Sequence, residues 1–252
     1  MFGIFKRYSN LIVVISGRKD GTMKLSGDLI KDKDTIENRK KFLKKLGIQE
    51  KATVIADLVH PVKFAPQLFN RVKVVSNADR EKTIKEIDGL ITADRNLFLT
   101  ITVADCLPIF IYEPEKEIIG LIHAGWRNLA GNILREAVEK IKTNNLLFGI
   151  GPGIGQCHFE VKEDVIAKFK PYLKDTLLKR NGKSFLDLKG LAKIQLLNLG
   201  IKEENIEISP ECTFCLKDKY FSFRRDVSPR QKFGSGDKPK NAKAMMAVIG
   251  MR

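Results

Sequence analysis

Short strand-like runs and helix-like stretches alternate from one end of this 252-residue chain to the other. No internal repeat, low-complexity segment or linker rich in proline, glycine and serine separates them. The strand-like runs outnumber the helical ones, and several are separated by long loops, which is typical of mixed sheets. We therefore predict an α+β fold with mixed β-sheets, built as a single domain over residues 1–252, rather than a regular doubly wound fold.

Four stretches have the apolar period of a helix. Near the start of the first, Asp34 and Glu37 form a capping-box pattern, and Gly47 is placed to end it. Asp187 is the expected N-cap of the last, and Gly200 its stop. The expected helices are residues 35–46, 129–141, 163–173 and 188–199.

Apolar and β-branched runs predict nine strands. The first run is far shorter than a membrane span and has no cleavage pattern, so we expect a strand, no membrane partner and a cytoplasmic location. The chain has 4 cysteines, too few for a disulfide framework, which fits a reducing compartment. The expected strands are residues 11–15, 53–59, 97–103, 109–112, 118–123, 146–150, 206–209, 220–224 and 244–249.

Positive charge dominates the composition. The chain has 45 Lys and Arg against 30 Asp and Glu, a formal net charge of +15, which favours anionic partners such as phosphate esters. The lysines are scattered along the helical stretches, and the aromatic-interleaved basic stripe of single-strand binders is missing from the sequence. We therefore do not expect nucleic acid as a partner, and the oligomeric state is not predicted.

Cys106 follows Asp105 between two strand-like runs, and Pro108 is expected to break the strand just after it. A thiolate is both a strong nucleophile and a good zinc ligand, so a catalytic role is open to this residue. The alternative is a small buried hydrophobic side chain, because free cysteine is among the most buried residue types. Asp105 is a further catalytic candidate, as an acid, a base or a residue that orients its neighbour.

His123 lies where a strand-like run gives way to a helix, followed by Gly125, Trp126 and Arg127. Arg127 is a candidate catalytic residue because its guanidinium can hold phosphate bidentately. The N-H groups that open the helix would favour an anion at the same place. The alternative is a histidine at a strand end beside a surface Trp-Arg stack.

His60 ends another strand-like run and is followed by Pro61. With Cys106 and His123 it would make a three-ligand metal site whose fourth position is open to water or substrate. The spacing matches no short metal motif, so the residues alone leave an ordinary polar role equally open.

Four further features carry weaker signals. Cys212 and Cys215 form a single CxxC, which we interpret as structural because no second CxxC is present. The glycine-rich residues 149–155 lack a nucleotide-binding order, and we interpret them as a strained loop near the site. Cys157 and His158 either line that site or pack elsewhere. Arg224 and Arg225 fall on an expected strand, whose period of two would turn only one of them toward a buried site.

Five motifs together resemble the laccase-domain purine nucleoside phosphorylase family, also labelled multicopper polyphenol oxidase. They are DGLIT at 88–92, ADCLPI at 104–109, HAGWR at 123–127, GPGIG at 151–155 and FSFRRD at 221–226. The resemblance covers nearly the whole chain. It implies a mixed-sheet α/β/β/α sandwich.

The resemblance also implies a function. The family's zinc ligands match His60, Cys106 and His123. The implied reaction is phosphorolysis of adenosine, inosine, guanosine or methylthioadenosine to a base and ribose 1-phosphate, with adenosine deamination as a companion activity. The sequence departs from the family pattern near these ligands at Leu58, Pro61 and Asn128, and before Arg230 at Pro229.

Three other functions compete with this one. A four-copper oxidase centre draws on many more histidines than the 3 in this chain, so only a single copper ion in place of zinc is left. A metal-free cysteine hydrolase would use the same Cys106 and His123 but not His60. A binding protein with a structural zinc would instead need a closed four-ligand site.

Overall fold

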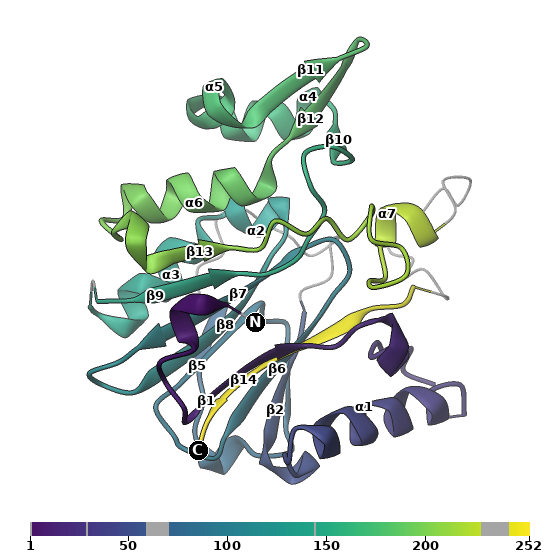
Figure 1. Cartoon of the computed structure of the whole chain (residues 1–252), viewed down its shortest axis with the longest axis vertical. Coiled ribbons are helices and arrows are strands. Elements are labelled where there is room, and N and C mark those ends of the chain that lie inside the picture. The colour runs from purple at the N-terminus through teal and green to yellow at the C-terminus, as the bar shows by residue number, and fades with distance from the viewer. Residues whose placement is uncertain (1, 29, 59–70, 144, 228–241) are drawn as a thin grey trace.

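Two β-sheets lie face to face at the centre of the molecule (Figure 1). The computed structural model describes residues 2–28, 30–58, 71–143, 145–227 and 242–252. The first sheet has the strand order β1-β14-β6-β2-β4, and the second has the order β13-β9-β7-β8-β5-β3. Each sheet contains both parallel and antiparallel pairs, such as β2 parallel to β6 and β7 antiparallel to β8. The mixed sheets expected from the sequence are therefore confirmed.

The strands of the first sheet are β1 (Leu11–Ile15), β2 (Thr53–Asp57), β4 (Thr83–Lys85), β6 (Phe98–Val103) and β14 (Met245–Met251). Those of the second are β3 (Val72–Val74), β5 (Gly89–Thr92), β7 (Leu107–Glu113), β8 (Ile118–Ala124), β9 (Leu147–Ile150) and β13 (Ile206–Ile208). A small third sheet holds β10 (Glu160–Val161), β11 (Leu177–Arg180) and β12 (Lys183–Leu186). The helices are α1 (Lys33–Lys45), α2 (Trp126–Ala130), α3 (Ile133–Ile141), α4 (Glu163–Ile166), α5 (Leu173–Thr176), α6 (Leu188–Asn198) and α7 (Phe223–Asp226).

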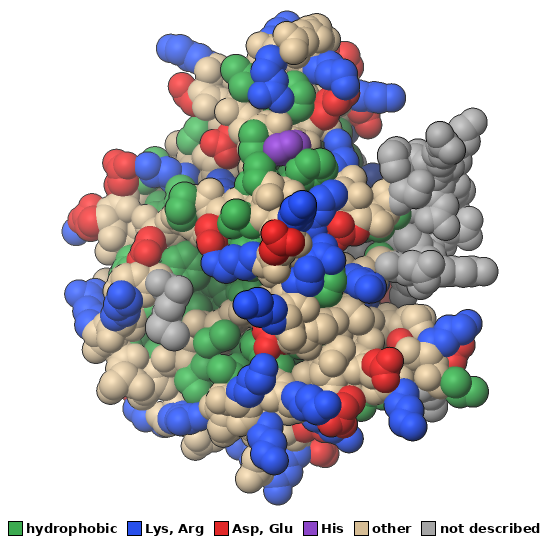
Figure 2. All heavy atoms as spheres, turned by 45° about the vertical axis from the view of Figure 1, so that its right-hand side comes forward, with side chains coloured by type: hydrophobic (Ala, Val, Ile, Leu, Met, Phe, Trp, Pro, Cys, Tyr) green, Lys and Arg blue, Asp and Glu red, His purple; other side chains and the backbone are tan. Residues whose placement is uncertain are grey.

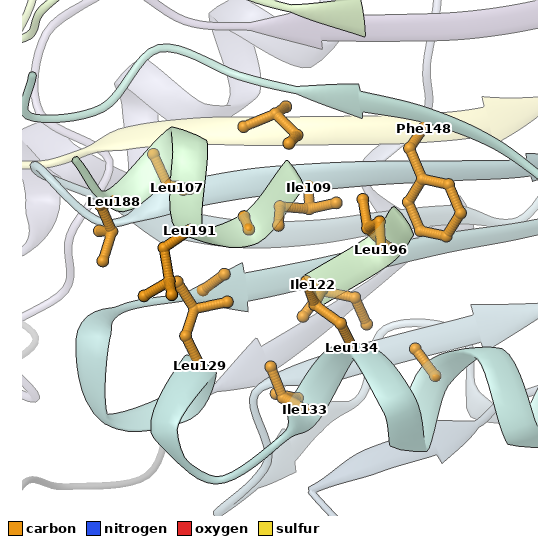
Figure 3. Packing of buried hydrophobic residues seen from close by; sticks show 14 of the residues in the cluster. Leu107, Ile109, Ile122, Leu129, Ile133, Leu134, Phe148, Leu188, Leu191 and Leu196 are labelled. Atoms are coloured by element: carbon orange, nitrogen blue, oxygen red, sulfur yellow. The ribbon is translucent and has the colours of Figure 1, made fainter. Parts of the chain in front are cut away.

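Strand β7 shows how both faces of the second sheet are covered. Its side chains alternate in direction, so Phe110 and Tyr112 join the core between the two sheets, where Ile101 of β6 lies. Ile109 and Ile111 point the other way, into a core shared with α2, α3 and α6 (Figure 3). Every residue of β7 is buried as a result.

Helix α1 covers the outer face of the first sheet. Its buried Phe42 and Leu43 share an apolar cluster with Phe98 of β6 and with Met246 and Val248 of β14. The layers therefore run α1, first sheet, second sheet, then α2, α3 and α6, which is the predicted α/β/β/α sandwich. The small third sheet, with α4 and α5, projects at the top of the molecule in Figure 1.

Two expected helices are interrupted. The helix expected at 129–141 is divided into α2 and α3, because Asn132 adopts the left-handed conformation with φ 58°. The helix expected at 163–173 continues beyond α4 only as a 3-10 turn over Ala167–Tyr172, which contains Pro171 and the non-helical Phe169. Proline cannot donate the N-H that an α-helix needs at this point.

Two cap and strand predictions are wrong. Helix α1 begins at Lys33, earlier than expected, so its N-cap is Asp32 rather than Asp34. The strand expected at 220–224 is absent, and residues 223–226 form α7 instead. There the Ser222 hydroxyl accepts a hydrogen bond from the Arg225 N-H at 3.2 Å and caps the helix. By contrast, Asp187 caps α6 as predicted, accepting from the N-H groups of Lys189 and Gly190.

Pro108 does not break the strand that follows Cys106. It lies inside β7, opposite His123 of β8. The His123 N-H donates instead to the Asp88 carbonyl at 2.7 Å, so this position of the ladder requires no N-H from the proline. The chain turns before β7, at residues 104–106.

Candidate active site

Antiparallel pairing places the start of β7 beside the end of β8, so Cys106 and His123 lie close together at the same end of these two strands. Leu107, next to Cys106, pairs with Ala124, next to His123. Gly125 lies between the two candidates: a Cβ there would stand 2.9 Å from the Cys106 Sγ. This close approach requires glycine at position 125.

The His123 ring is oriented by a buried carboxylate. Its Nδ1 lies 2.9 Å from Oδ1 of Asp88, whose side chain is 1% exposed. An ionised carboxylate only accepts hydrogen bonds, so Nδ1 carries the proton. In the neutral ring, Nε2 then presents its lone pair, which is the arrangement of metal-ligating histidines with a carboxylate behind them.

The groups that surround the His123 ring favour a positive charge there. Burial alone would lower the pKa of His123, but the Cys106 sulfur, which hydrogen-bonds the ring, and the Asp88 carboxylate raise it to about 10. Burial would raise the pKa of Asp88, yet the hydrogen bonds from His123 and then Arg71 hold it below its usual range. The Asp88 carboxylate and the Cys106 sulfur therefore both lie against one imidazole, and these donors fit a bound metal ion as well as a proton.

Asn128 and Arg127 follow on α2. The Asn128 Nδ2 donates to the His123 carbonyl at 2.7 Å, so this departure from the family pattern supports the site. The Arg127 guanidinium stacks on the Trp126 ring at 4.3 Å. Within the described ranges it makes no hydrogen bond or salt bridge, and its donors are available to an anion. Helix α2 begins directly beside it, with Gly125 as N-cap.

Asp105 adopts φ 80° and directs a buried carboxylate away from solvent. Oδ1 accepts from the Thr213 hydroxyl at 2.6 Å. Oδ2 accepts from the Ser222 hydroxyl at 3.0 Å and from the Arg224 N-H at 2.7 Å. These bonds tie the turn that carries Cys106 to two segments from the far end of the chain.

The adjacent arginines have different surroundings. The Arg225 guanidinium donates to the carbonyls of Thr213, Phe214 and Tyr220 at 2.7–2.8 Å, which commits most of its donors to the protein. Arg224 is exposed and donates to the Glu160 carbonyl at 3.1 Å. Of the two, Arg225 therefore has a structural role in holding the loop.

Residues 149–155 lie against the same turn. Gly153 packs so closely against this turn that a Cβ would lie 2.9 Å from the Asp105 carbonyl oxygen and 2.4 Å from the Leu107 side chain. None of the glycines in this segment has a positive φ. The expectation of backbone strain here is therefore wrong, and close packing is the reason for glycine at position 153.

Two residues of the candidate site lay outside the sequence predictions. Asp88 had no predicted role beyond its place in the DGLIT motif, and its ion-pair partner Arg71 carried no signal. His60 lies outside the described residues, so its role as a ligand stays a prediction.

A second group of ligand atoms lies elsewhere. Those of Cys157, His158, Cys212 and Cys215 are all within 4.8 Å of one another. Cys106 and His123 are not among them. This cluster joins the CxxC to two residues, Cys157 and His158, that no local sequence motif groups with it.

One cavity is lined by none of these residues. It measures about 600 Å³ and lies between α1 and residues 18–21, lined among others by Arg18, Lys19, Asn38 and Lys45. It contains no candidate catalytic residue. Figure 2 shows Lys and Arg side chains spread widely over the visible face with Asp and Glu among them, in agreement with the scattered charge of the sequence.

Residues 24–235 match the family model described as multi-copper polyphenol oxidoreductase laccase. The chain belongs to this family. Among curated proteins, this laccase-family chain is 32% identical over 239 residues to purine nucleoside phosphorylase YlmD of Bacillus subtilis, covering 88% of this chain and 79% of that protein. It is 27% identical over 190 residues to adenosine deaminase RL5 of an unknown prokaryotic organism, covering 71% and 72%.

The crystal structure of YlmD from Geobacillus stearothermophilus superposes on this laccase-family chain with a TM-score of 0.81 and 26% identity, covering 98% of this chain and 94% of that one. The predicted family and fold are thus confirmed. Among the helices of the described residues, none combines the length and the apolar character needed to cross a membrane.

Proposed function

We propose that this chain is a metal-dependent purine nucleoside phosphorylase. Its substrates would be adenosine, inosine, guanosine or methylthioadenosine together with phosphate, and its products a base and ribose 1-phosphate. The observation that carries the proposal is the array of Asp88, His123 and Cys106 at one sheet edge, with the Arg127 guanidinium beside it. Similarity to proteins named purine nucleoside phosphorylase supports the same reaction.

The proposed metal is zinc, held by His60, Cys106 and His123. Three protein ligands would leave one position open, as in catalytic zinc sites, whereas copper is the alternative metal for the same donors. When bound, zinc supplies Lewis-acid chemistry to an oxygen or nitrogen of the substrate. Asp88 accepts a hydrogen bond from Nδ1 of His123, so that Nε2 would be the ligand atom.

Phosphorolysis breaks the bond between C1′ of the ribose and the base nitrogen and forms a bond from C1′ to a phosphate oxygen, while the base takes up a proton. Arg127 would bind and orient the phosphate with its guanidinium N-H donors. We propose a positioning role for Asp105, because its carboxylate already accepts three hydrogen bonds. Cys106 would act as a ligand.

The test is product analysis with purified protein. Adenosine or inosine is incubated with and without phosphate, before and after complete metal removal and after zinc is restored. Release of base that requires both phosphate and metal supports the proposal. Base release without phosphate, or full activity after metal removal, would overturn it.

A second candidate, a metal-free cysteine hydrolase, is favoured by the same geometry. Cys106, His123 and Asp88 stand in the order of a nucleophile, a base and a residue that orients the base. Such an enzyme would survive metal removal and lose activity with an alkylated Cys106. Similarity to adenosine deaminase RL5 makes deamination of adenosine a companion activity to assay.

The proposed partners are therefore small molecules, purine nucleosides and phosphate. A cytoplasmic location remains a prediction, with which the free thiols of all four cysteines agree.

A further inference from the structure

Three sulfurs and one imidazole converge outside the candidate active site. The Cys157 Sγ lies 3.7 Å from the Sγ of both Cys212 and Cys215. The His158 Nδ1 lies 3.2 Å from the Cys157 Sγ and 3.3 Å from the Cys215 Sγ. Four soft donor atoms thus surround one point, supplied by two segments far apart in the sequence.

These distances are those of a tetrahedral site. Sulfurs about 2.3 Å from a central zinc at tetrahedral angles stand roughly 3.8 Å apart, and a histidine nitrogen stands roughly 3.5 Å from each sulfur. The four separations given above lie close to these values, and the other pairs of donor atoms lie within 4.8 Å of each other. A disulfide, in contrast, would bring two sulfurs to about 2.05 Å.

The surrounding chain orients the donors. The Gly155 N-H donates to the Cys212 Sγ at 3.1 Å, a bond that suits a thiolate. The His158 ring stacks on Phe214 with centroids 4.0 Å apart and planes 17° apart, so the CxxC loop itself fixes the direction of the imidazole. A Cβ at Gly155 would meet the Cys157 Sγ and the Cys212 Cβ at 3.2 Å, so a larger residue would crowd the site.

We propose that Cys157, His158, Cys212 and Cys215 hold a structural Zn²⁺ ion, separate from the metal of the proposed active site. Four protein ligands close the coordination shell, so this site stabilises the fold and takes no substrate. It joins the segment that follows β9 to the loop between β13 and α7.

The same loop reaches the candidate active site. Thr213, between the two cysteines of the CxxC, donates to Asp105 at 2.6 Å, and Asp105 adjoins Cys106. The Thr213 N-H also donates to the Gly153 carbonyl at 3.0 Å. Zinc at the cluster would therefore hold in place Thr213, one of the three hydrogen-bond donors of Asp105.

Native mass spectrometry of the full chain, loaded with Zn²⁺ alone and freed of loosely bound metal, tests the proposal. The Cys157→Ser/Cys215→Ser variant should carry one zinc ion fewer per chain than the wild type. The Cys106→Ala variant should keep the zinc of the cluster whatever the fate of the proposed catalytic metal. Equal zinc content in the wild type and the double variant would overturn the proposal.

Two further measurements do not depend on folding of the double variant. X-ray absorption on zinc-loaded Cys106→Ala protein should show three sulfur neighbours and one nitrogen, and absence of zinc there would overturn the proposal. A Cys215→His variant, which keeps four donors, should retain the ion. If the wild type instead contains a disulfide among these cysteines and no cluster zinc, seen as a mass lower by two hydrogens, the proposal is wrong.

Discussion

The Asp88 Oδ1 lies 2.9 Å from the His123 Nδ1, and the same residue's carbonyl accepts the His123 backbone N-H at 2.7 Å. The side chain and backbone of one residue, directly before β5, thus fix both the position and the tautomer of the imidazole on β8. This relationship gives the imidazole the orientation that the proposed metal site requires.

Asp88→Asn should weaken zinc binding to the candidate active site by about 10–100-fold, because the amide no longer enforces the proton on Nδ1. Competition with a chromophoric chelator measures the affinity. The exposed Asp34→Asn serves as the matched control and should bind zinc like the wild type. An unchanged affinity in the Asp88 variant would show that the carboxylate does not orient a ligand.

His123 should make the stability of the metal-free protein depend on pH. Its pKa is raised in the fold to about 10 from an ordinary value of 6.5. Protonated His123 therefore contributes fully to the free energy of unfolding below pH 6.5, and this contribution is lost as pH rises to about 10. Urea unfolding of metal-free wild type and His123→Gln at several pH values measures this. The difference in free energy of unfolding between the wild type and His123→Gln should shrink as pH rises across that range. A difference that grows with pH would contradict a raised pKa of His123.

Arg127→Ala should raise the KM for phosphate roughly tenfold or more, because a hydrogen bond to a charged group contributes about 1.5–3 kcal/mol. The KM for the nucleoside should change much less. Arg135→Ala, an exposed arginine of α3 paired with Glu139, is the control for loss of positive charge. Equal effects of the two variants on phosphate KM would argue against a phosphate contact by Arg127.

Thr213→Val should destabilise the fold by about 1–3 kcal/mol, since it leaves a buried carboxylate oxygen of Asp105 without its donor. The change keeps the shape of the side chain. Denaturant unfolding gives the free energy, with Thr83→Val on the exposed edge strand β4 as control. A loss no larger than that of the control would mean that water replaces the hydroxyl.

The layers of the fold were predictable because apolar periodicity records burial. Strand β1 has the bounds expected from its run, and α6 has the predicted cap and stop. The interruptions were not predictable in the same way. Asn132 and Phe169 break helices whose apolar pattern continues across them, and α7 forms because Ser222 caps a segment whose composition suits a strand.

The candidate site was predictable only in part. Cys106 and His123 are chemically distinctive, and the sequence places both at strand ends, whereas Asp88 looks like any acidic residue before a strand. The cluster around Cys157 and Cys212 depends on a contact between segments 55 residues apart, which no local spacing encodes. His60 lies outside the described residues, and its place as a third ligand remains a prediction.

Formation of ribose 1-phosphate from inosine and phosphate, measured side by side for zinc-loaded wild type, Cys106→Ala and Asp34→Asn, tests the central claim most directly. A catalytic zinc ion bound by Cys106 should give phosphate-dependent product with the wild type and Asp34→Asn, and loss of both product and one bound zinc ion with Cys106→Ala. Undiminished product from a Cys106→Ala protein that has lost no zinc would contradict it.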